Sequence, residues 1–189
     1  MRGTNEEQKR ITCESLLSAL IELWETKPYD KITVTELARK AGVSRMAFYR
    51  NYDSIDQIVV EHMRGLYQTY LDDLVRDGRT LYIDYSVRFF QYVAANERFM
   101  RKALEAGFFE VLLESIEDHI SSEESWRVAD VDMTKFGDKQ LRRFMTGGYL
   151  VVLANWLEGG MAETPEEMGE TTSAYVHTLL GPAIERKPN

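Results

Sequence analysis

The chain has 189 residues, of which 44% are hydrophobic and 29% charged, with a formal net charge of −8 and a single cysteine. This length suits one compact domain, or a small domain attached to a larger one, and it can bury a core without metals or disulfides. The lone Cys13 excludes an intramolecular disulfide framework, and the net acidity argues against a protein that coats nucleic acid without selectivity.

Neither the N-terminus nor the longest apolar run has the properties of a targeting or membrane segment. The first ten residues, MRGTNEEQKR, are charged and lack the apolar stretch of a signal peptide. The apolar run at residues 144–157 is shorter than the roughly 20 residues that cross a bilayer. Both observations favour a soluble cytoplasmic protein.

Helical spacing of apolar residues recurs along the chain, and no convincing run of strict alternation predicts a strand. The first helix is expected to end at residues 27–30, KPYD. Its apolar stripe consists of Cys13, Leu16, Leu17, Leu20, Ile21 and Trp24. Two short helices are predicted within residues 33–51, followed by a long helix that opens with Ser54 and Gln57 as a capping box.

The remaining elements are predicted to be helices as well. The long helix closes near residues 77–78, and an aromatic-rich helix covers residues 82–93. Further along, Gly107 interrupts the helical pattern, and the next helix spans residues 108–120. Residues 121–138 lack periodicity and are expected to form a loop.

Two helices finish the chain. Thr164 can cap the last one, because proline and two glutamates follow it, and Gly181-Pro182 stops it. The fold class is therefore all-α, with about nine helices. We expect a three-helix domain in residues 1–52 and a larger helical domain in residues 53–189.

Charge is unevenly divided between these two parts. Residues 1–52 contain nine Lys or Arg against seven Asp or Glu, a net of +2, whereas residues 53–189 contain 14 against 24, a net of −10. A mildly basic N-terminal part is compatible with a small segment that binds nucleic acid locally.

Residues 33–52 have the order of a helix-turn-helix. Thr33 can cap a first short helix, and Gly42 offers the positive φ that a tight turn between helices requires. Ser44 can then cap a second short helix that buries Phe48. Small residues around the turn let the two helices cross closely, which is the physical signature of this motif.

The second short helix leaves two guanidinium groups, a flexible apolar side chain and a phenol pointing outward. Such a set can contact phosphates and base edges in a major groove. A helical hairpin with a solvated basic face is the plainer alternative, but the ordered set of caps, glycine and aromatic favours a DNA reader. The predicted DNA-binding residues are Thr33, Ser44, Arg45, Met46, Tyr49 and Arg50.

The stretch ITVTELARKAGVSRMAFYRNYDSIDQIV, residues 32–59, resembles the TetR family of one-component transcriptional regulators. That resemblance implies a three-helix DNA-binding domain, a larger helical domain that binds a small effector, and homodimerisation through the last two helices. It places Thr33 and Tyr49 at usual phosphate-contacting positions. It places Arg45 and Met46 where the family commonly reads bases or the adjoining backbone.

Two positions depart from the family's usual pattern. Ile55 stands where the family usually has a phosphate-contacting lysine, and Met46 replaces what is often Gly, Ala, Ser or Pro. Ile55 predicts fewer backbone contacts and a weaker salt dependence of DNA binding. The segments VSRMAFYRNY and WLEGGMAETPEEM further resemble a branch near the dihydroxyacetone-kinase regulators.

As a helix, the run at residues 144–157 is apolar on almost every face, whereas a surface helix of a monomer should have one polar face. We therefore expect a homodimer built from this helix and the last one, although a buried central helix of a monomer would give the same pattern. The predicted interface residues are Phe144, Gly148, Val151, Val152, Trp156, Met168, Tyr175 and Leu179.

Aromatic side chains are concentrated in the middle of the chain, where they can line an apolar pocket for an effector or simply form core. The predicted pocket residues are His62, Tyr67, Tyr85, Phe89, Tyr92 and Phe108. The other histidines, His119 and His177, have no partner at metal-ligand spacing, so no metal or other cofactor is expected.

No glycine-rich phosphate loop, paired-histidine motif, GxSxG or CxxC occurs in the sequence, which predicts that the protein is not an enzyme. It predicts instead a DNA-binding transcriptional regulator: a repressor released from an inverted-repeat operator by an unknown small-molecule effector. Two alternatives remain open. One is an effector-independent or partner-dependent activator or adaptor of the same fold, and the other is a helical ligand-binding protein whose helix-turn-helix reads no DNA.

Overall fold

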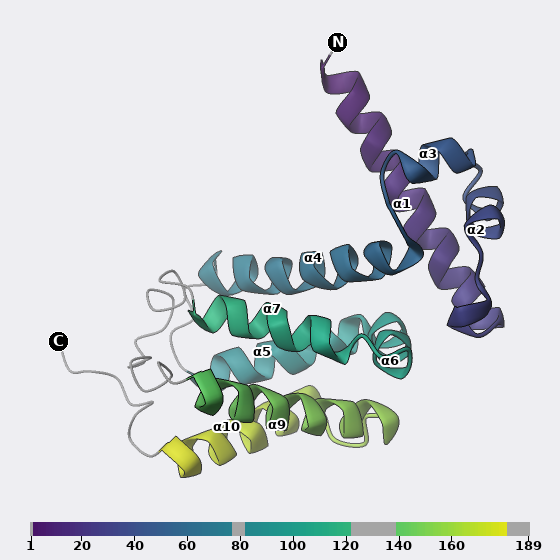
Figure 1. Ribbon diagram of the computed structural model, residues 1–189. Helices are drawn as coiled ribbons and strands as arrows, with labels where there is room; N and C mark the ends of the chain where they lie inside the picture. The colour runs from purple at the N-terminus through teal and green to yellow at the C-terminus, as the bar shows by residue number, and fades with distance from the viewer. Residues whose placement is uncertain (1, 77–81, 122–138, 181–189) are drawn as a thin grey trace. The chain divides into compact units, whose positions relative to one another are not determined.

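The structure, a computed structural model, describes residues 2–76, 82–121 and 139–180. In these ranges the chain forms nine α-helices and one 3-10 helix, and contains no strand (Figure 1). The predicted all-α fold is therefore confirmed. The expected loop before the last two helices and the expected helix ends at residues 77–78 and 181–182 lie outside the described ranges.

The chain divides into two compact units, Met1–Met63 and Arg64–Asn189. The first unit contains α1 (Arg2–Thr26), the 3-10 helix η1 (Tyr29–Lys31), α2 (Val34–Lys40), α3 (Arg45–Tyr49) and the beginning of α4 (Ile55–Arg76). The second contains the rest of α4 and then α5 (Tyr82–Ala95), α6 (Glu97–Glu105), α7 (Phe109–Ser121), α9 (Lys139–Glu158) and α10 (Pro165–Leu180). The two compact units divide within α4, between Met63 and Arg64. The predicted division into functional domains between residues 52 and 53 stays a prediction.

The core of the first unit forms where one face of α1 packs against α2 and α3. Leu16 and Leu20 of α1, Leu37 of α2 and Phe48 of α3 are all fully buried. Apolar side chains three and four residues apart share one helix face, so the stripe predicted for the first helix becomes this buried face.

The predicted caps fix where α4 and α10 begin. The Ser54 hydroxyl accepts a hydrogen bond from the Gln57 backbone N–H at 3.2 Å, and the Gln57 side chain reaches back to the N–H of Asp53 at 2.7 Å. In α10 the capping box is reciprocal, because Thr164 accepts from the N–H of Glu167 at 3.2 Å and donates its own N–H to that glutamate at 2.8 Å. Each cap satisfies N–H groups that the first helical turn leaves without partners.

Helix α9 contains the apolar run predicted at residues 144–157 and begins five residues before it. One face of this helix is buried in the second unit through Leu150, Leu153 and Leu157. Even so, no helix within the described ranges is long and apolar enough to cross a membrane.

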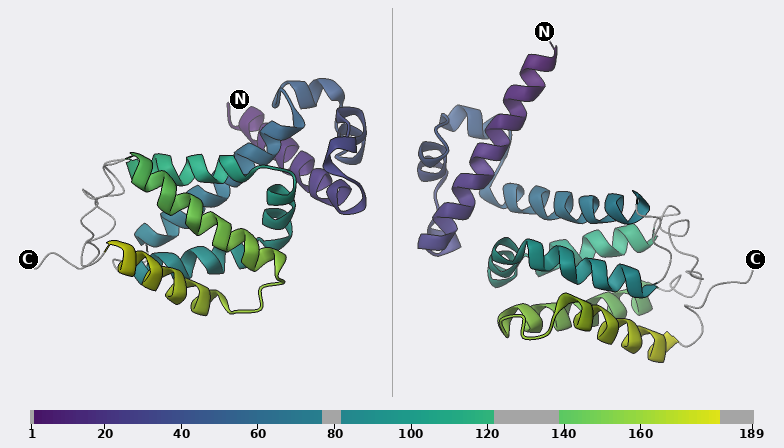
Figure 2. Two further views of the ribbon diagram at one scale, coloured as in Figure 1. Left: turned by 60° about the horizontal axis from the view of Figure 1, so that its bottom comes forward. Right: turned by 180° about the vertical axis from the view of Figure 1, so that it is seen from behind.

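Helices α5 and α10 pack side by side in the second unit (Figures 1 and 2). Small side chains permit the close approach, since Ser86 of α5 and Thr172 of α10 are both almost completely buried. At the closest point, a Cβ atom added to Gly169 would lie 2.4 Å from the Cα atom of Val87. Glycine is thus required at position 169 for contact between the two helices, whatever its backbone angles.

Replacement of Gly169 should therefore destabilise the second unit. Gly169→Ala inserts a methyl group against backbone atoms of Val87 that cannot move independently, and overpacking of this kind costs about 1–3 kcal/mol of unfolding free energy. The matched control is Gly65→Ala in α4, where the added Cβ meets nothing within 4 Å. That control should stabilise the helix by about 0.5–1 kcal/mol. Chemical denaturation of both variants measures the difference, and equal effects would contradict the close packing.

Candidate DNA-binding surface

The turn between α2 and α3 is closed by a Schellman motif. Gly42 has a φ of +69°, and its N–H bonds to the carbonyl of Arg39 at 3.2 Å. The N–H of Val43 bonds to the carbonyl of Ala38 at 2.9 Å. These two bonds satisfy the last carbonyls of α2 and fix the direction in which the chain leaves it. The predicted role of glycine at position 42 is confirmed.

Both short helices begin with a side-chain cap. The Thr33 hydroxyl accepts from the N–H of Glu36 at 3.3 Å, and the Ser44 hydroxyl accepts from the N–H of Ala47 at 3.0 Å. The carboxylate of Glu36 also accepts from the Lys27 ammonium at 2.6 Å. This hydrogen bond is the largest of the causes that hold the pKa of Glu36 below its ordinary value, and the backbone of Thr33 adds to it.

The outer face of α3 carries the residues predicted to read DNA. Phe48 is fully buried on the opposite face, which fixes the rotation of this short helix about its axis. Met46 is 81% exposed and Tyr49 is 51% exposed, with the Tyr49 ring set edge-on against Phe48 at a centroid distance of 5.2 Å. Arg45 and Arg50 are exposed as well.

All six residues of the predicted DNA-binding set are therefore at the surface of the first unit. Two of them, Thr33 and Ser44, already use their hydroxyls as helix caps, so they can offer DNA only the remaining hydrogen-bonding capacity of that group. DNA contact by these six residues stays a prediction.

Part of the positive charge in this segment serves the fold instead. The Lys40 ammonium pairs with the Glu22 carboxylate of α1 at 2.6 Å, which joins the end of α2 to the first helix. Among the described residues, neither Arg45 nor Arg50 forms an ion pair. The cations on α3 thus remain open to an external anion, while Lys40 is compensated internally.

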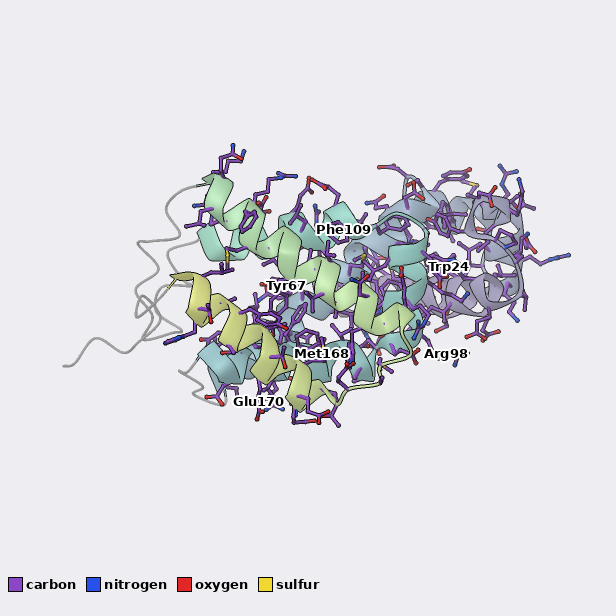
Figure 3. The ribbon with its side chains drawn as sticks, turned by 90° about the horizontal axis from the view of Figure 1, so that it is seen from below. Trp24, Tyr67, Arg98, Phe109, Met168 and Glu170 are labelled. Atoms are coloured by element: carbon purple, nitrogen blue, oxygen red, sulfur yellow. The ribbon has the colours of Figure 1, made fainter. Side chains whose placement is uncertain are left out.

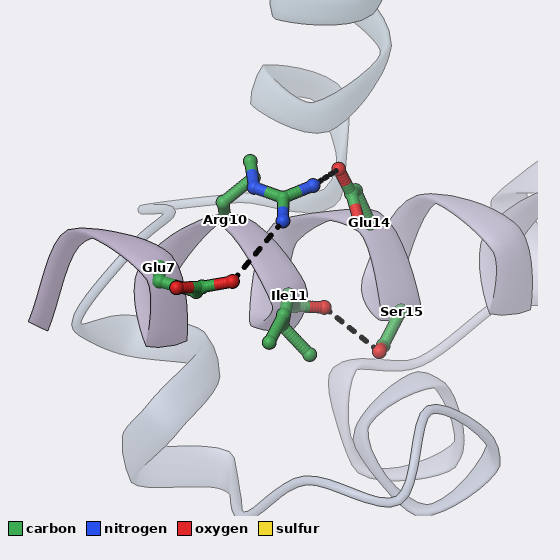
Figure 4. A network of polar contacts seen from close by, with 5 residues as sticks. All are labelled: Glu7, Arg10, Ile11, Glu14 and Ser15. Carbon is green, nitrogen blue, oxygen red and sulfur yellow. Dashed lines mark hydrogen bonds and ion pairs between the residues drawn. The ribbon is translucent and has the colours of Figure 1, made fainter. Parts of the chain in front are cut away.

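The N-terminal half of α1 carries a further group of paired charges (Figure 4). The guanidinium of Arg10 lies 3.6 Å from the Glu7 carboxylate and 2.8 Å from that of Glu14. Ser15 donates a hydrogen bond to the carbonyl of Ile11 one turn before it. Exposed ion pairs of this kind contribute only roughly 0–1 kcal/mol each to stability. Their main effect is to neutralise the charge of Arg10 on the surface of α1.

One contact in the first unit has no signal in the sequence. The Tyr29 hydroxyl of η1 donates a hydrogen bond to the carboxylate of Asp56 in the first turn of α4. The Tyr29 ring also packs against Trp24 at a centroid distance of 4.6 Å. Burial, followed by the bond to Asp56, raises the pKa of the Tyr29 phenol far above its ordinary value. Tyr29 therefore joins the segment that enters α2 to the start of α4.

The last two helices each expose apolar side chains. On α9, Phe144 is 69% and Val151 is 52% exposed, with exposed Gly148 between them at helical spacing; on α10, Tyr175 and Leu179 are exposed one turn apart. Three other residues of the predicted interface contribute less surface. Val152 is half-buried, and Trp156 and Met168 are buried within the chain itself.

Trp156 has a defined place in the second unit. Its indole N–H donates to the carbonyl of Glu163 at 2.9 Å, and its ring meets Phe90 edge-on at 5.3 Å. Trp156 lies on the side of α9 that packs inward, whereas Phe144 and Val151 lie on its exposed side. Sequence periodicity could not decide which residues belonged to which side.

Aromatic rings from α4, α5 and α9 form a continuous cluster in the second unit. Tyr70 is buried and lies within 5.6–6.1 Å, centroid to centroid, of Tyr67, Phe89 and Tyr92. The cluster continues through Tyr149, which lies 5.4 Å from Phe89. Figure 3 shows the side chains of this unit, with Tyr67 of α4 and Met168 of α10 labelled.

The predicted pocket residues take different positions around this cluster. Tyr67, Phe89 and Tyr92 belong to it, and the carbonyl of Tyr85 accepts a hydrogen bond from the Tyr70 hydroxyl at 3.1 Å. Burial, with a smaller effect of Asp84, raises the pKa of Tyr85 to about 12. Tyr70 and Tyr149 were not in the predicted set, because a single tyrosine in an apolar stripe gives no sign of what it contacts.

The remaining two predicted pocket residues are His62 and Phe108. His62 is in the part of α4 that belongs to the first unit, and burial lowers its pKa. Phe108 follows Gly107 at the turn between α6 and α7. Within the described ranges, no group of three or more His, Cys, Asp or Glu side chains could hold a metal ion.

Two short helices crossing at a glycine turn, with an exposed cationic face on the second, define a helix-turn-helix protein. A family model described as "Bacterial regulatory proteins, tetR family" matches residues 16–61, and one described as "Transcriptional regulator C-terminal region" matches residues 82–178. The chain belongs to the TetR family and is a transcriptional regulator with a DNA-binding helix-turn-helix. The finer resemblance to dihydroxyacetone-kinase regulators stays a prediction.

Two similar proteins extend this result. The nucleoid occlusion factor SlmA of Idiomarina loihiensis is 46% identical over 48 residues, which are 25% of this chain and 24% of that protein. The chain thus matches about a quarter of the length of that relative. The crystal structure of Thermus thermophilus FadR, a TetR-family transcriptional repressor in complex with lauroyl-CoA, has a TM-score of 0.51 at 15% identity, covering 94% of this chain and 98% of that one. At this identity the likeness concerns the fold alone.

The bond between Tyr29 and Asp56 generates a prediction for the stability of the first unit. In a double-mutant cycle of Tyr29→Phe and Asp56→Ala, the coupling energy should be about 1.5–3 kcal/mol, the usual net value of a hydrogen bond to a charged group. Phenylalanine keeps the ring contact with Trp24, so the cycle isolates the hydroxyl–carboxylate bond. Urea unfolding of the four proteins gives the coupling, and strictly additive effects would show that the bond contributes nothing.

Proposed function

We propose that the protein is a homodimeric repressor that binds an inverted-repeat DNA operator and is released from it by a small apolar effector. One observation carries this proposal: α3 and its C-cap residue present Arg45, Met46, Tyr49 and Arg50 to solvent while the buried Phe48 anchors the helix. A reading helix needs this combination of a fixed rotation and an open polar face. The operator would be chromosomal DNA, which places the protein in the cytoplasm.

The residues of the first unit divide by the part of DNA that they would contact. Arg45 and Met46, at the start of α3, would reach base edges, because the N-terminal residues of a reading helix enter the major groove. Thr33, Ser44 and Tyr49 would contact phosphates, which position the protein without specifying sequence. Arg50 can bond phosphate through its guanidinium fork.

The start of α4 would contribute little to phosphate binding. Ile55, the first residue of this helix, has no charge, and the carboxylate of Asp56 follows it. Each cation that meets a phosphate adds about 0.9 to the slope of log affinity against log salt concentration. We therefore expect a shallower salt dependence than a lysine at this position would produce.

Dimerisation would use the exposed apolar side chains of α9 and α10. Phe144 and Val151 expose large apolar side chains on either side of Gly148, a position where two helices can approach closely. A second copy of the chain would cover these side chains and pair two reading helices. Two helices related in this way address half-sites roughly 34–36 Å apart on one side of the duplex.

An effector would bind beside the aromatic cluster of α4, α5 and α9. Rings from Tyr67, Phe89 and Tyr92 offer apolar contact, and tyrosine hydroxyls can orient a polar group of the ligand. The similar structure of FadR holds lauroyl-CoA, whose acyl chain is apolar, and this supports an effector with an apolar part. Because α4 continues from the first unit into the second, a ligand that favours one position of this helix would change the spacing of the two readers.

Selection from a random pool of DNA duplexes tests the proposal directly. The full chain is incubated with the pool at near-physiological salt without any ligand, and bound duplexes are amplified and sequenced. An enriched inverted repeat supports a dimeric sequence reader. If a folded, dimeric protein enriches no duplex, the result favours the two alternatives: a partner-dependent regulator, or a ligand-binding protein whose helix-turn-helix binds no DNA.

Substitutions on α3 should separate the two kinds of contact. Tyr49→Ala is expected to weaken binding to operator and random DNA by similar factors, because a phosphate contact carries no sequence information. Arg45→Ala should also reduce the preference for operator over random DNA, by about tenfold or more, because a good base contact discriminates by about 1–3 kcal/mol.

The matched control for this experiment is Arg101→Ala. Arg101 lies on α6 and pairs with Glu97, so the substitution removes an equal charge from the second unit. Fluorescence anisotropy measures the affinities of the wild type and the three variants for both DNAs. Equal losses on every sequence from Arg45→Ala and Tyr49→Ala would refute the division of roles.

The proposed interface predicts a change in oligomeric state. Val151→Glu places a charge among the exposed apolar side chains of α9 and should convert the dimer into a monomer, since a carboxylate buried unpaired in the interface is strongly unfavourable. Val75→Glu on α4 is the control, because Val75 is 60% exposed and lies outside the proposed interface. Sedimentation equilibrium distinguishes the species. A Val151→Glu protein that remains dimeric would place the interface on another surface.

A further inference from the structure

Met46 is the most exposed large hydrophobic side chain among the described residues. A single exposed apolar residue is ordinary on a protein surface and by itself indicates no function. The position of Met46 is what distinguishes it. It is the second residue of the five-residue helix α3, on the face opposite the buried ring of Phe48.

The geometry of α3 restricts what Met46 can contact once DNA is bound. The Ser44 cap and the burial of Phe48 fix where the helix begins and how it is rotated. In a helix-turn-helix the first residues of the reading helix meet base edges, whereas later residues approach the backbone. Met46 would therefore meet a base, and it would do so from a position that the fold holds constant.

The chemistry of methionine restricts the base. Its thioether has no hydrogen-bond donor and is only a weak acceptor, so it cannot read the donor and acceptor pattern of a base pair. It can form apolar contact, and its flexible, polarisable side chain adapts to a small apolar group. In the major groove, the group of this kind that an unmodified base pair presents is the C5-methyl of thymine.

We infer that Met46 recognises the C5-methyl group of a pyrimidine, which in unmodified DNA is thymine, at one position in each half-site. This inference rests on the proposed function, because it requires α3 to lie in the major groove. It assigns a specificity-determining role to the exposed apolar residue at the start of α3. The neighbouring Arg45 would read its own base by hydrogen bonds, independently of the methyl group.

The expected effect follows from the size of the buried group. Removing one methyl group from an apolar contact should weaken binding by about fourfold for each half-site, and by about fifteenfold when both half-sites are changed. Deoxyuridine is the direct probe, because it differs from thymidine only by the missing C5-methyl and keeps the same hydrogen-bonding groups.

The test uses the full chain and the operator obtained by selection from the random pool. Each thymine of the operator is replaced in turn by deoxyuridine, at symmetric positions in both half-sites, and dissociation constants are measured at one fixed salt concentration. The wild-type protein is compared with Met46→Leu, which stays apolar, and with Met46→Gln, which keeps the length but is polar. All three residues have similar helix propensity, and position 46 is exposed, so both variants should fold and unfold like the wild type.

We expect one thymine per half-site at which deoxyuridine weakens binding by the wild type and by Met46→Leu, but not by Met46→Gln. At that same position, 5-methylcytosine paired with guanine should bind the wild type more tightly than unmethylated cytosine. This second arm shows whether the methyl group itself is read in either base. A loss with deoxyuridine that has no counterpart with 5-methylcytosine would overturn the inference, because it would assign the effect to another property of the thymine pair.

Two further outcomes distinguish a failure of this inference from a failure of the proposed function. An operator that is enriched but has the same deoxyuridine penalties for the wild type and for Met46→Gln would overturn this inference and leave the proposed function standing. Failure to enrich any operator would overturn both.

Discussion

The turn at Gly42 is the constraint on which the reading unit depends. Its positive φ and the two hydrogen bonds from Gly42 and Val43 set the angle at which α3 leaves α2. The ring of Phe48 is then buried in the core of the first unit, and Arg45, Met46 and Tyr49 are left exposed on a helix only five residues long. A side chain at position 42 would strain this backbone, and the direction of every outward residue on α3 would change with it.

In the second unit, close packing and open surface are found on the same two helices. α10 approaches α5 so closely at Gly169 that a Cβ atom has no room, whereas Tyr175 and Leu179 further along α10 are exposed. α9 shows the same division, with Leu150, Leu153 and Leu157 packed inward and Phe144 exposed. An apolar surface held on a rigid helical layer is well suited to a partner, because little conformational entropy is lost when it is covered.

Local signals in the sequence predicted the elements that local physics determines. Thr33, Ser54 and Thr164 cap helices where they were expected to, because a hydroxyl and the N–H three residues later are brought together by the helix itself. Contacts between distant segments could not be predicted in this way. Tyr29 and Asp56 are 27 positions apart, and nothing in the spacing of either residue identifies the other. Trp156 was expected at a subunit interface and is buried within its own chain, since an all-round apolar helix does not indicate which side faces inward.

The ion pair between Lys40 and Glu22 bears on how the protein would search a chromosome. A cation compensated within the fold adds little to the attraction that any DNA sequence exerts, so fewer molecules would be held at the very large number of irrelevant sites. The acidic remainder of the chain would also weaken attraction to DNA in general. Occupancy of the correct site would then depend on the few exposed side chains of α3. Charge compensation of this kind would raise selectivity by weakening binding to irrelevant sites and not by raising the affinity for every duplex.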